Sequence, residues 1–219
     1  MPASAESAPA LFGVYALTPD DNLLPRLTAL VESALAGGVR WVQYRNKLAP
    51  TDLRRVEAAA LLKVCNAHGA KLIINDDVWL AVEIGAHGAH VGRDDLPGGS
   101  LKTAREALGP NRILGVSCYA DLARAEVAVE AGADYIAFGS LFPSVSKPQA
   151  TRASLDVIRE AKRRFPVPVV GIGGITTGNA RQVLEAGADM IAVLSDLFDA
   201  MDIRKQAEKF NQLFKEHRS

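Results

Sequence analysis

The stretch Gly132-Ala133-Asp134-Tyr135 shows how this chain is organised. It follows an Ala-rich stretch with helical spacing and leads directly into the apolar run 135–139, so a helix ends here and a strand begins. A glycine supplies the left-handed conformation that ends many helices, and a strand then follows within a few residues. Similar stretches recur, led by Gly37, Gly85 and Gly187. Four such units, each long enough for two strand–helix pairs, predict eight pairs in all.

Short β-branched or aromatic runs alternate along the chain with longer amphipathic stretches, which is the order of an α/β protein with a parallel sheet. The expected strands are residues 11–17, 40–45, 72–75, 89–92, 113–117, 135–139, 167–171 and 190–194. No composition break or linker divides the chain after residue 10. The sequence therefore predicts a single (β/α)8 barrel, the TIM barrel, over residues 11–219, preceded by a disordered tail at residues 1–10.

Composition excludes several classes of protein. Hydrophobic residues make up 48% of the 219 residues, and 25 Lys+Arg balance 25 Asp+Glu. A formal charge of zero gives no overall field that would attract nucleic acid or an anionic membrane. No apolar run approaches the ~18 residues of a membrane helix, and the first residues lack the pattern of a secretory signal. Cys65 and Cys118 suit reduced thiols, so we expect a cytoplasmic protein. The sequence leaves open whether it forms a homo-oligomer.

Polar residues cluster where the expected strands end, which is where the chemistry of such a barrel occurs. Asp76 and Asp95 follow neighbouring strands and would face the same end of the barrel. Magnesium typically binds one or two protein carboxylates, and water and substrate phosphate fill its other positions, so we predict that these two residues bind Mg²⁺. Two alternatives stay open: stretch 75–77 could cap the following helix, and Asp94-Asp95 could form a solvated turn.

The positively charged residues at two strand ends suggest a polyphosphate site. Arg45, Lys47 and Lys147 would lie opposite the two aspartates, and Ser144 and Ser146 stand just before Lys147. Guanidinium, ammonium and hydroxyl groups are the donors that a phosphorylated substrate requires. The alternative is that each cation is an ordinary surface residue.

A second anion site is expected after the seventh strand. Gly171-Ile172-Gly173-Gly174 is followed by Asn179 and a helix, and Ser195 ends the eighth strand. Backbone N–H groups and a helix N-terminus hold phosphate at this place in many barrels. A tight turn that needs small residues is the alternative.

His90 and the tryptophans have less specific patterns. We expect His90 to be a hydrogen-bonded residue of the barrel interior rather than a catalytic base, and Trp41 and Trp79 to pack in the core. Stacking on a substrate is the alternative for both tryptophans, and for Tyr15 stacking and core packing stay equally open.

Taken together, six segments resemble the thiamine-phosphate synthase family, and the resemblance runs from about residue 11 to residue 198. The segments are 42–47, 72–76, 90–97, 115–117, 142–147 and 170–175. The resemblance implies a transferase that joins a hydroxymethylpyrimidine diphosphate to a thiazole phosphate, releasing diphosphate and giving thiamine monophosphate. It also implies that the pyrimidine diphosphate ionises with the help of magnesium before the thiazole nitrogen captures the cation.

The resemblance assigns roles to individual positions. Asp76 and Asp95 would hold magnesium, and Arg45, Lys47 and Lys147 would act in catalysis on the leaving diphosphate. The residues that would contact the pyrimidine diphosphate are Gln43, Arg45, Lys47, Asn75, Ser117 and Lys147. The residues that would contact the thiazole phosphate are Ser144, Ser146, Gly174, Leu194 and Ser195.

The chain also departs from the family pattern. The family usually has leucine at Tyr44, an acidic residue at Asn46, glutamine at Arg93 and histidine at Tyr119. Cys118 stands where a small residue or threonine is usual, and Ser144 and Ser146 replace threonines. Two alternative functions remain at this point. One is a thiazole tautomerase of the related subfamily, an isomerase that needs no diphosphate site; the other is a non-catalytic phosphate-binding barrel.

Overall fold

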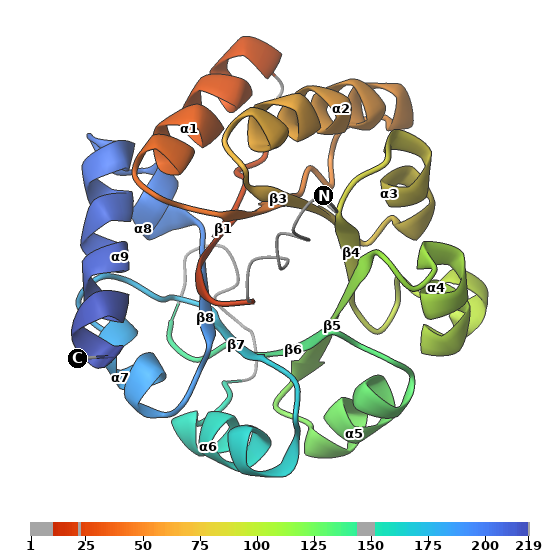
Figure 1. Ribbon diagram of the computed structural model, residues 1–219, viewed down its shortest axis with the longest axis vertical. Helices are drawn as coiled ribbons and strands as arrows, with labels where there is room; N and C mark the ends of the chain where they lie inside the picture. The colour runs from red at the N-terminus through yellow and green to blue at the C-terminus, as the bar shows by residue number, and fades with distance from the viewer. Residues whose placement is uncertain (1–10, 22, 144–151, 219) are drawn as a thin grey trace, which may run out of the picture.

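The computed structural model describes residues 11–21, 23–143 and 152–218. Within these ranges, eight parallel strands pair in chain order and close into a barrel, with β8 beside β1 (Figure 1). The strands are β1 (Gly13–Leu17), β2 (Trp41–Tyr44), β3 (Lys71–Asn75), β4 (Gly88–Val91), β5 (Ile113–Tyr119), β6 (Tyr135–Phe138), β7 (Val169–Ile172) and β8 (Met190–Val193). Each lies within two residues of its expected bounds, and the predicted (β/α)8 fold is confirmed.

Helices form an outer ring around the barrel (Figure 1). They are α1 (Leu24–Ala36), α2 (Thr51–Ala67), α3 (Val78–Ile84), the 3₁₀ turn η1 (Pro97–Gly99), α4 (Leu101–Leu108), α5 (Leu122–Glu130), α6 (Leu155–Arg164), α7 (Ala180–Glu185), α8 (Ser195–Phe198) and α9 (Ile203–Arg218). The tail predicted at residues 1–10 and the segment 144–151 lie outside the described residues.

The strands separate two cores because successive strand residues point to opposite faces. Trp41 of β2 points into the barrel, where it belongs to the same cluster as Tyr15 and Tyr135. Tyr44 points outward, into the larger cluster between the sheet and the helices. Gly115 leaves room for an interior ring, because a Cβ atom there would lie 2.0 Å from Cζ of Tyr135. Trp41 is buried within this interior cluster, which confirms its expected position in the core.

The residue before each of β4, β6 and β8 fastens that strand to the one before it. The Asp134 N–H donates to the carbonyl of Leu114 at 2.8 Å, and the Asp134 carboxylate accepts the Leu114 N–H at 2.7 Å. Asp189 makes the same two hydrogen bonds with Val169, both at 2.8 Å. We call this reciprocal pair a strand clamp. The clamps join β5 to β6 and β7 to β8 at the N-terminal ends of the strands.

A third strand clamp uses a histidine. The His87 N–H donates to the Leu72 carbonyl at 3.0 Å, and Nδ1 of the ring accepts the Leu72 N–H at 3.1 Å, which joins β3 to β4. Each clamp residue stands two positions after a glycine with positive φ. In the first copy that glycine is Gly38, at φ 95°, whereas Gly37 has φ −79°. The expectation of Gly37 as the leading glycine was therefore wrong by one residue.

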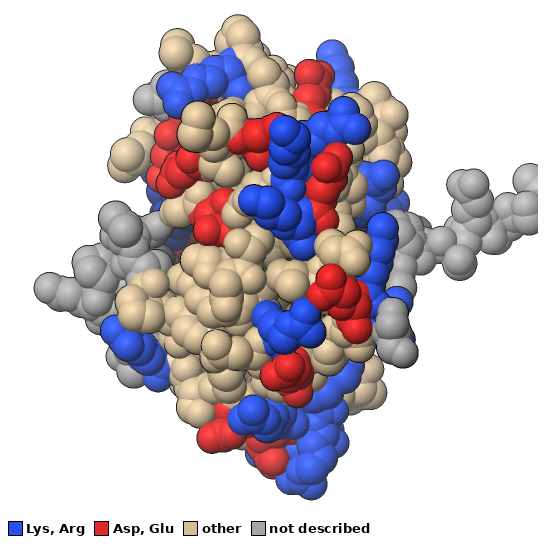
Figure 2. Space-filling model, turned by 90° about the vertical axis from the view of Figure 1, so that its left-hand side faces the viewer, with Lys and Arg blue, Asp and Glu red and all other residues tan. Residues whose placement is uncertain are grey.

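Charges on the helices are mixed in sign. On the face that carries α9, Lys and Arg side chains alternate with Asp and Glu (Figure 2). Ion pairs such as Arg181 with Glu216, at 2.6 Å, and Arg204 with Glu208, at 3.0 Å, account for part of this pattern. In the described ranges, no helix has the length and apolar character needed to cross a membrane.

Candidate active site

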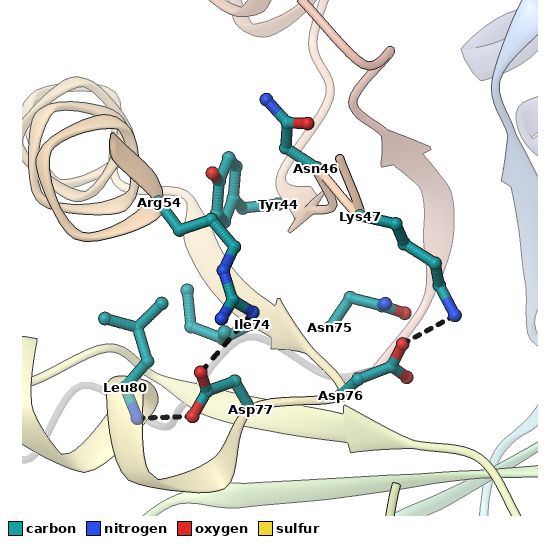
Figure 3. Close-up of a pocket in the computed structure, with 9 residues that line it drawn as sticks. All are labelled: Tyr44, Asn46, Lys47, Arg54, Ile74, Asn75, Asp76, Asp77 and Leu80. Carbon is teal, nitrogen blue, oxygen red and sulfur yellow. Dashed lines mark hydrogen bonds and ion pairs between the residues drawn. The ribbon is translucent and has the colours of Figure 1, made fainter. Parts of the chain in front are cut away.

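A cleft opens at the C-terminal ends of β2 and β3 (Figure 3). Its lining comes from the ends of β2 and β3 and from the first turns of α2 and α3: Tyr44, Asn46, Lys47, Arg54, Ile74, Asn75, Asp76, Asp77 and Leu80. A second hollow lies beside it and is lined by Asp76, Asp77, Val78, Trp79, Asp95, Leu96 and Pro97. Asp76 therefore lies between the two hollows, at the same end of the barrel as Asp95.

The three polar residues Asn75, Asp76 and Asp77 at the end of β3 are placed in different ways. Asp77 is the N-cap of α3, since its carboxylate accepts the Leu80 N–H at 2.9 Å. Asp76 does not cap the helix; it sits at φ 64° and donates its N–H to the His90 carbonyl at 2.7 Å. Asn75 ends β3 and lines the cleft. Capping is thus the role of Asp77, and the Asp76 carboxylate is free to face the cleft.

The carboxyl groups of Asp76 and Asp95 lie close enough to interact, and both residues line the second hollow. Burial raises the pKa of Asp95 above its usual range, and the neighbouring Asp76 raises it further, while Lys47 opposes this shift. Gly92 permits the approach, because a Cβ atom there would lie 2.7 Å from Oδ2 of Asp95. Two carboxylates this close repel unless a proton or a cation lies between them. The structure therefore brings the two predicted metal ligands together.

The predicted cations Arg45 and Lys47 are paired with carboxylates that follow the flanking strands. Nζ of Lys47 lies 2.8 Å from Oδ2 of Asp76 (Figure 3), and Arg45 lies 3.1 Å from Oδ2 of Asp20. The Lys47 N–H also donates to Asp20, at 3.3 Å. Positive and negative groups thus alternate around one opening, which suits a substrate that carries both a metal ion and phosphate groups.

The sequence interpretation did not single out Thr18 and Asp20, which follow β1. Thr18 is fully buried, and its hydroxyl donates to the Arg45 carbonyl at 3.1 Å and accepts the Arg45 N–H at 2.9 Å. This pair of bonds fixes the backbone at the end of β2. The sequence carries a signal for these two residues, because Thr18-Pro19-Asp20 stands at a strand end, as do the polar segments after β2 and β3.

A chain of hydrogen bonds crosses the barrel interior below the cleft. Nε2 of Gln43 donates to the Tyr15 hydroxyl at 2.9 Å, which lies 2.9 Å from the Tyr135 hydroxyl. His90 joins Tyr135 through Nδ1 at 2.9 Å and the Ser117 hydroxyl through Nε2 at 2.8 Å. The chain links two predicted substrate-binding residues, Gln43 and Ser117.

Burial controls the ionisation of this interior chain. It lowers the pKa of His90 to about 4 and raises the pKa of Tyr15 and Tyr135 above the ordinary value for tyrosine. His90 is therefore neutral at pH 7, so one ring nitrogen donates and the other accepts. The expected position of His90, hydrogen-bonded inside the barrel, is confirmed.

Tyr119 lies at the rim of the site after β5. Its ring stands 5.3 Å from the guanidinium of Arg93 and 5.9 Å from that of Arg124, and its hydroxyl accepts the Arg93 N–H at 3.3 Å. Nε of Arg124 also donates to the Ser117 carbonyl at 2.7 Å. The two departures from the family pattern at Arg93 and Tyr119 are therefore in contact with each other.

The predicted phosphate site lies at the ends of β7 and β8. Gly173 and Gly174 have φ 101° and 63°, and a Cβ atom on Gly174 would lie 2.3 Å from the Pro143 carbonyl oxygen, so only glycine fits this turn. Nδ2 of Asn179 donates to the Gly174 carbonyl at 2.9 Å. Ser195 begins α8 directly after Leu194.

One carboxylate connects the two halves of this site. Oδ2 of Asp196, the residue after Ser195, accepts the Thr177 N–H at 3.0 Å and a hydrogen bond from Gln206 at 2.7 Å. The turn after β7 and the start of α8 are thus held together as one unit.

Three of the predicted site residues stay untested, and the prediction for Trp79 is contradicted. Ser144, Ser146 and Lys147 fall in the segment 144–151, outside the described residues, so their roles stay predictions. The expectation for Trp79 was wrong, because this residue is 60% exposed on α3 beside the Asp95 hollow. The reason is helical: α3 buries Val78, Leu80 and Ala81, and position 79 points away from that face.

The fold and the site define a TIM-barrel protein with acidic and basic residues at one mouth and a glycine-rich turn after β7. Comparison with known families identifies which barrel it is. The family model described as thiamine monophosphate synthase matches residues 14–197. The chain therefore belongs to the thiamine-phosphate synthase family, and the resemblance inferred from its sequence segments is confirmed.

Individual relatives agree with the family. The chain is 50% identical over 202 residues to thiamine-phosphate synthase of Thiobacillus denitrificans, covering 92% of this chain and 94% of that protein. It is 50% identical over 204 residues to that of Nitrosococcus oceani, with 92% of each covered. Among solved structures, thiamine phosphate pyrophosphorylase from Pyrococcus furiosus superposes with a TM-score of 0.84 at 34% identity, over 95% of this chain and 98% of that one.

Proposed function

We propose that this member of the thiamine-phosphate synthase family catalyses the transfer that its relatives are named for. A hydroxymethylpyrimidine diphosphate loses its diphosphate, and the thiazole nitrogen of a thiazole phosphate takes its place, giving thiamine monophosphate. The carbon–oxygen bond breaks with its electron pair staying on diphosphate, and the nitrogen lone pair forms the new carbon–nitrogen bond. The observation that carries the proposal is the meeting of Asp76, Asp95 and Lys47 at one mouth.

The donor set fits a magnesium ion held by Asp76 and Asp95. The described residues contain no group of three or more Asp, Glu, His or Cys side chains placed to hold a metal. That excludes a closed all-protein cage there and matches the habit of Mg²⁺, which binds one or two carboxylates plus water and substrate phosphate. The contact between the two carboxylates, unfavourable in itself, supports this assignment. When bound, the ion would supply positive charge next to the departing diphosphate.

The cations of the chain would stabilise the leaving group. Arg45 and Lys47 stand at the end of β2, and Lys147 is assigned the same task by the family resemblance. Positive groups already in place where charge develops lower the barrier without reorganisation. No side-chain nucleophile is required, because the reaction breaks a bond to a good leaving group and joins two bound molecules.

Two anion sites would hold the reactants in register. The turn at Gly173-Gly174 and the start of α8 at Ser195 would bind the thiazole phosphate, with Ser144 and Ser146 as further donors. The β2 and β3 ends would bind the diphosphate. Correct placement of two reactants can contribute roughly 7–11 kcal/mol to lowering a barrier when the geometry is ideal. Closure of the site would also keep water from the pyrimidine cation.

The cysteines and the substrates suggest where the enzyme works. Cys65 and Cys118 are free and buried, and burial raises the pKa of both thiols to about 12, so neither is reactive at neutral pH. Stable reduced thiols and phosphorylated small-molecule substrates are typical of the cytoplasm. We place the activity there.

A diphosphate-release assay tests the proposal. Purified protein is supplied with both substrates, with each substrate alone, and with both substrates after magnesium is removed. We expect release only when both substrates and magnesium are present, together with thiamine monophosphate in equal amount. Conversion of a thiazole carboxylate phosphate without any diphosphate release would instead show the isomerase. Folded protein that binds phosphate and converts nothing would show a non-catalytic barrel.

A further inference from the structure

Glu57 of α2 is the fully buried carboxylate of this protein. Of the Asp and Glu residues in the described ranges, it alone is completely hidden from solvent, at 0% exposure. A buried carboxylate is costly unless donors compensate it. Its Oε2 accepts the Tyr44 hydroxyl at 2.6 Å and Nδ2 of Asn46 at 3.1 Å. None of the ion pairs in the described part of the chain includes Glu57, and its Oε1 has no hydrogen-bond partner.

The two donors stand on the outer side of the β2 end. Tyr44 belongs to the cluster between sheet and helices, and Asn46 is buried, 4% exposed, two residues further on. Residues two apart in an extended chain share a side, so the residues between and beside them turn the other way. Gln43 does so and bonds inside the barrel. Lys47 reaches toward Asp76 while the Asn46 side chain points away from it (Figure 3).

Glu57 thus holds the segment through Tyr44 and Asn46, while the two cations of the same segment pair with carboxylates that follow β1 and β3. Arg45 stands between the two gripped residues, and Lys47 follows the second. Thr18 fixes the Arg45 backbone from the β1 side. A charged acceptor strengthens hydrogen bonds about twofold over neutral ones, so this grip is strong for two contacts.

We infer that Glu57 is a positioning residue for the diphosphate site: by gripping Tyr44 and Asn46 it sets the direction of Arg45 and Lys47. The inference rests on the proposed function, because it takes the ligand of those cations to be a diphosphate. Both departures from the family pattern in this segment, Tyr44 and Asn46, are donors to Glu57.

The test compares Glu57→Leu with Glu57→Gln by calorimetric binding of inorganic diphosphate in the presence of magnesium. Glu57→Gln keeps one acceptor oxygen for both donors and puts its NH₂ where Oε1 has no partner, whereas Glu57→Leu keeps the volume and loses both bonds. We expect Glu57→Leu to weaken diphosphate binding ~10- to 100-fold and Glu57→Gln to stay within ~3-fold of the parent. The KM for the pyrimidine diphosphate should follow the same order, and the KM for the thiazole phosphate should not move.

A matched control separates positioning from folding. Leu61→Ala truncates a fully buried side chain one turn further along α2. The Leu61 side chain has no polar group, so it makes no hydrogen bond to the β2 end. The substitution should lower Tm and leave diphosphate binding unchanged. If Glu57→Leu does not fold, Tyr44→Phe, which removes only the hydroxyl, should weaken diphosphate binding ~3- to 10-fold without a shift in the thiazole phosphate KM.

The outcomes decide the two proposals separately. Equal diphosphate affinity in the parent, Glu57→Leu and Tyr44→Phe proteins would overturn the role of Glu57, as would equal KM changes for both substrates. The parent protein's diphosphate release with both substrates is measured first. If the parent releases none, the proposed function fails, while the binding series with inorganic diphosphate still shows whether Glu57 orients the cations.

Discussion

The two ends of the barrel use the same residue type in opposite ways. At the N-terminal end, Asp134 and Asp189 each accept a backbone N–H and pair with a cation, Arg105 at 2.8 Å and Lys162 at 2.7 Å. At the C-terminal end, Asp76 pairs with Lys47 at 2.8 Å but also interacts with a second carboxyl group, that of Asp95. A satisfied carboxylate contributes stability, whereas a repelling pair costs stability and is available to a ligand. The comparison separates carboxylates that stabilise the fold from carboxylates that are available to bind a ligand.

The largest effect should come from Asp76→Asn. Asparagine tolerates the left-handed backbone at φ 64°, so the change removes a charge with little strain. We expect kcat to fall ~10²- to 10³-fold because a proposed magnesium ligand is lost. Tm should change little, because the loss of the partly exposed Lys47 ion pair is offset by relief of the repulsion with Asp95. Steady-state kinetics and thermal unfolding measure both. A large drop in Tm would show instead that Asp76 stabilises the fold, as Asp134 and Asp189 do.

Asp189→Ala should have the opposite effect to Asp76→Asn: it should lower stability and leave catalysis unchanged. It leaves the Val169 N–H without its second partner and Lys162 without its ion pair, at a cost of about 2 kcal/mol in the free energy of unfolding. For a chain of this size that lowers Tm by roughly 4–8 °C. The kcat of the folded protein should be unchanged. Asp189→Asn keeps an acceptor for Val169 and should lose less; a kcat that falls with Asp189→Ala would contradict the assignment.

Thr18→Val should lower both stability and activity, so it should not follow the division between the two ends of the barrel. Thr18 lies at the catalytic end yet is fully buried and bonds both backbone groups of Arg45. We expect a loss of about 1–2 kcal/mol in stability, because two polar groups lose their partner, together with a ~10-fold fall in kcat/KM for the pyrimidine diphosphate. Thr18→Ser retains the hydroxyl and serves as control. Stability lost without any kinetic change would make Thr18 purely structural.

His87→Asn sharpens the comparison through pH. Burial lowers the pKa of His87 from 6.5 to about 4, so the unfolded chain binds a proton in that interval and the folded chain does not. Stability is therefore fully present above pH 6.5 and is lost as pH falls toward 4. The loss due to His87 should be about 1 kcal/mol, allowing for its partial exposure. Tm measured from pH 7 to 4 should depend less steeply on pH in the variant; parallel curves would exclude this role.

The fold could be predicted because its signals are local. Strand runs, glycines at helix ends and helical spacing each depend on a few neighbouring residues, and the eight strands follow from them. The closeness of Asp76 and Asp95, the two residues proposed to bind magnesium, followed from one rule, that strand ends of a barrel meet. Where the rule was not applied, after β1, Thr18 and Asp20 were missed.

Other features depend on contacts that sequence does not carry. Glu57 resembles any helix glutamate until α2 is packed on the β2 end, where Tyr44 and Asn46 reach it. Trp79 was placed in the core because large aromatic residues usually pack there, yet α3 is too short to bury two faces. The one-residue shift from Gly37 to Gly38 needed backbone angles, since both are glycines.

The strand clamps also make some strand pairings of the barrel stronger than others. His87, Asp134 and Asp189 add a side-chain bond within the pairs β3–β4, β5–β6 and β7–β8, and none of these three bonds spans β4–β5 or β6–β7. Local opening of the native barrel should therefore begin at strand pairings that lack a clamp, so that the two strands of each clamped pair separate from their neighbours together. In amide hydrogen exchange, the N–H groups of Leu72, Leu114 and Val169 would then be among the last to exchange at their end of the barrel.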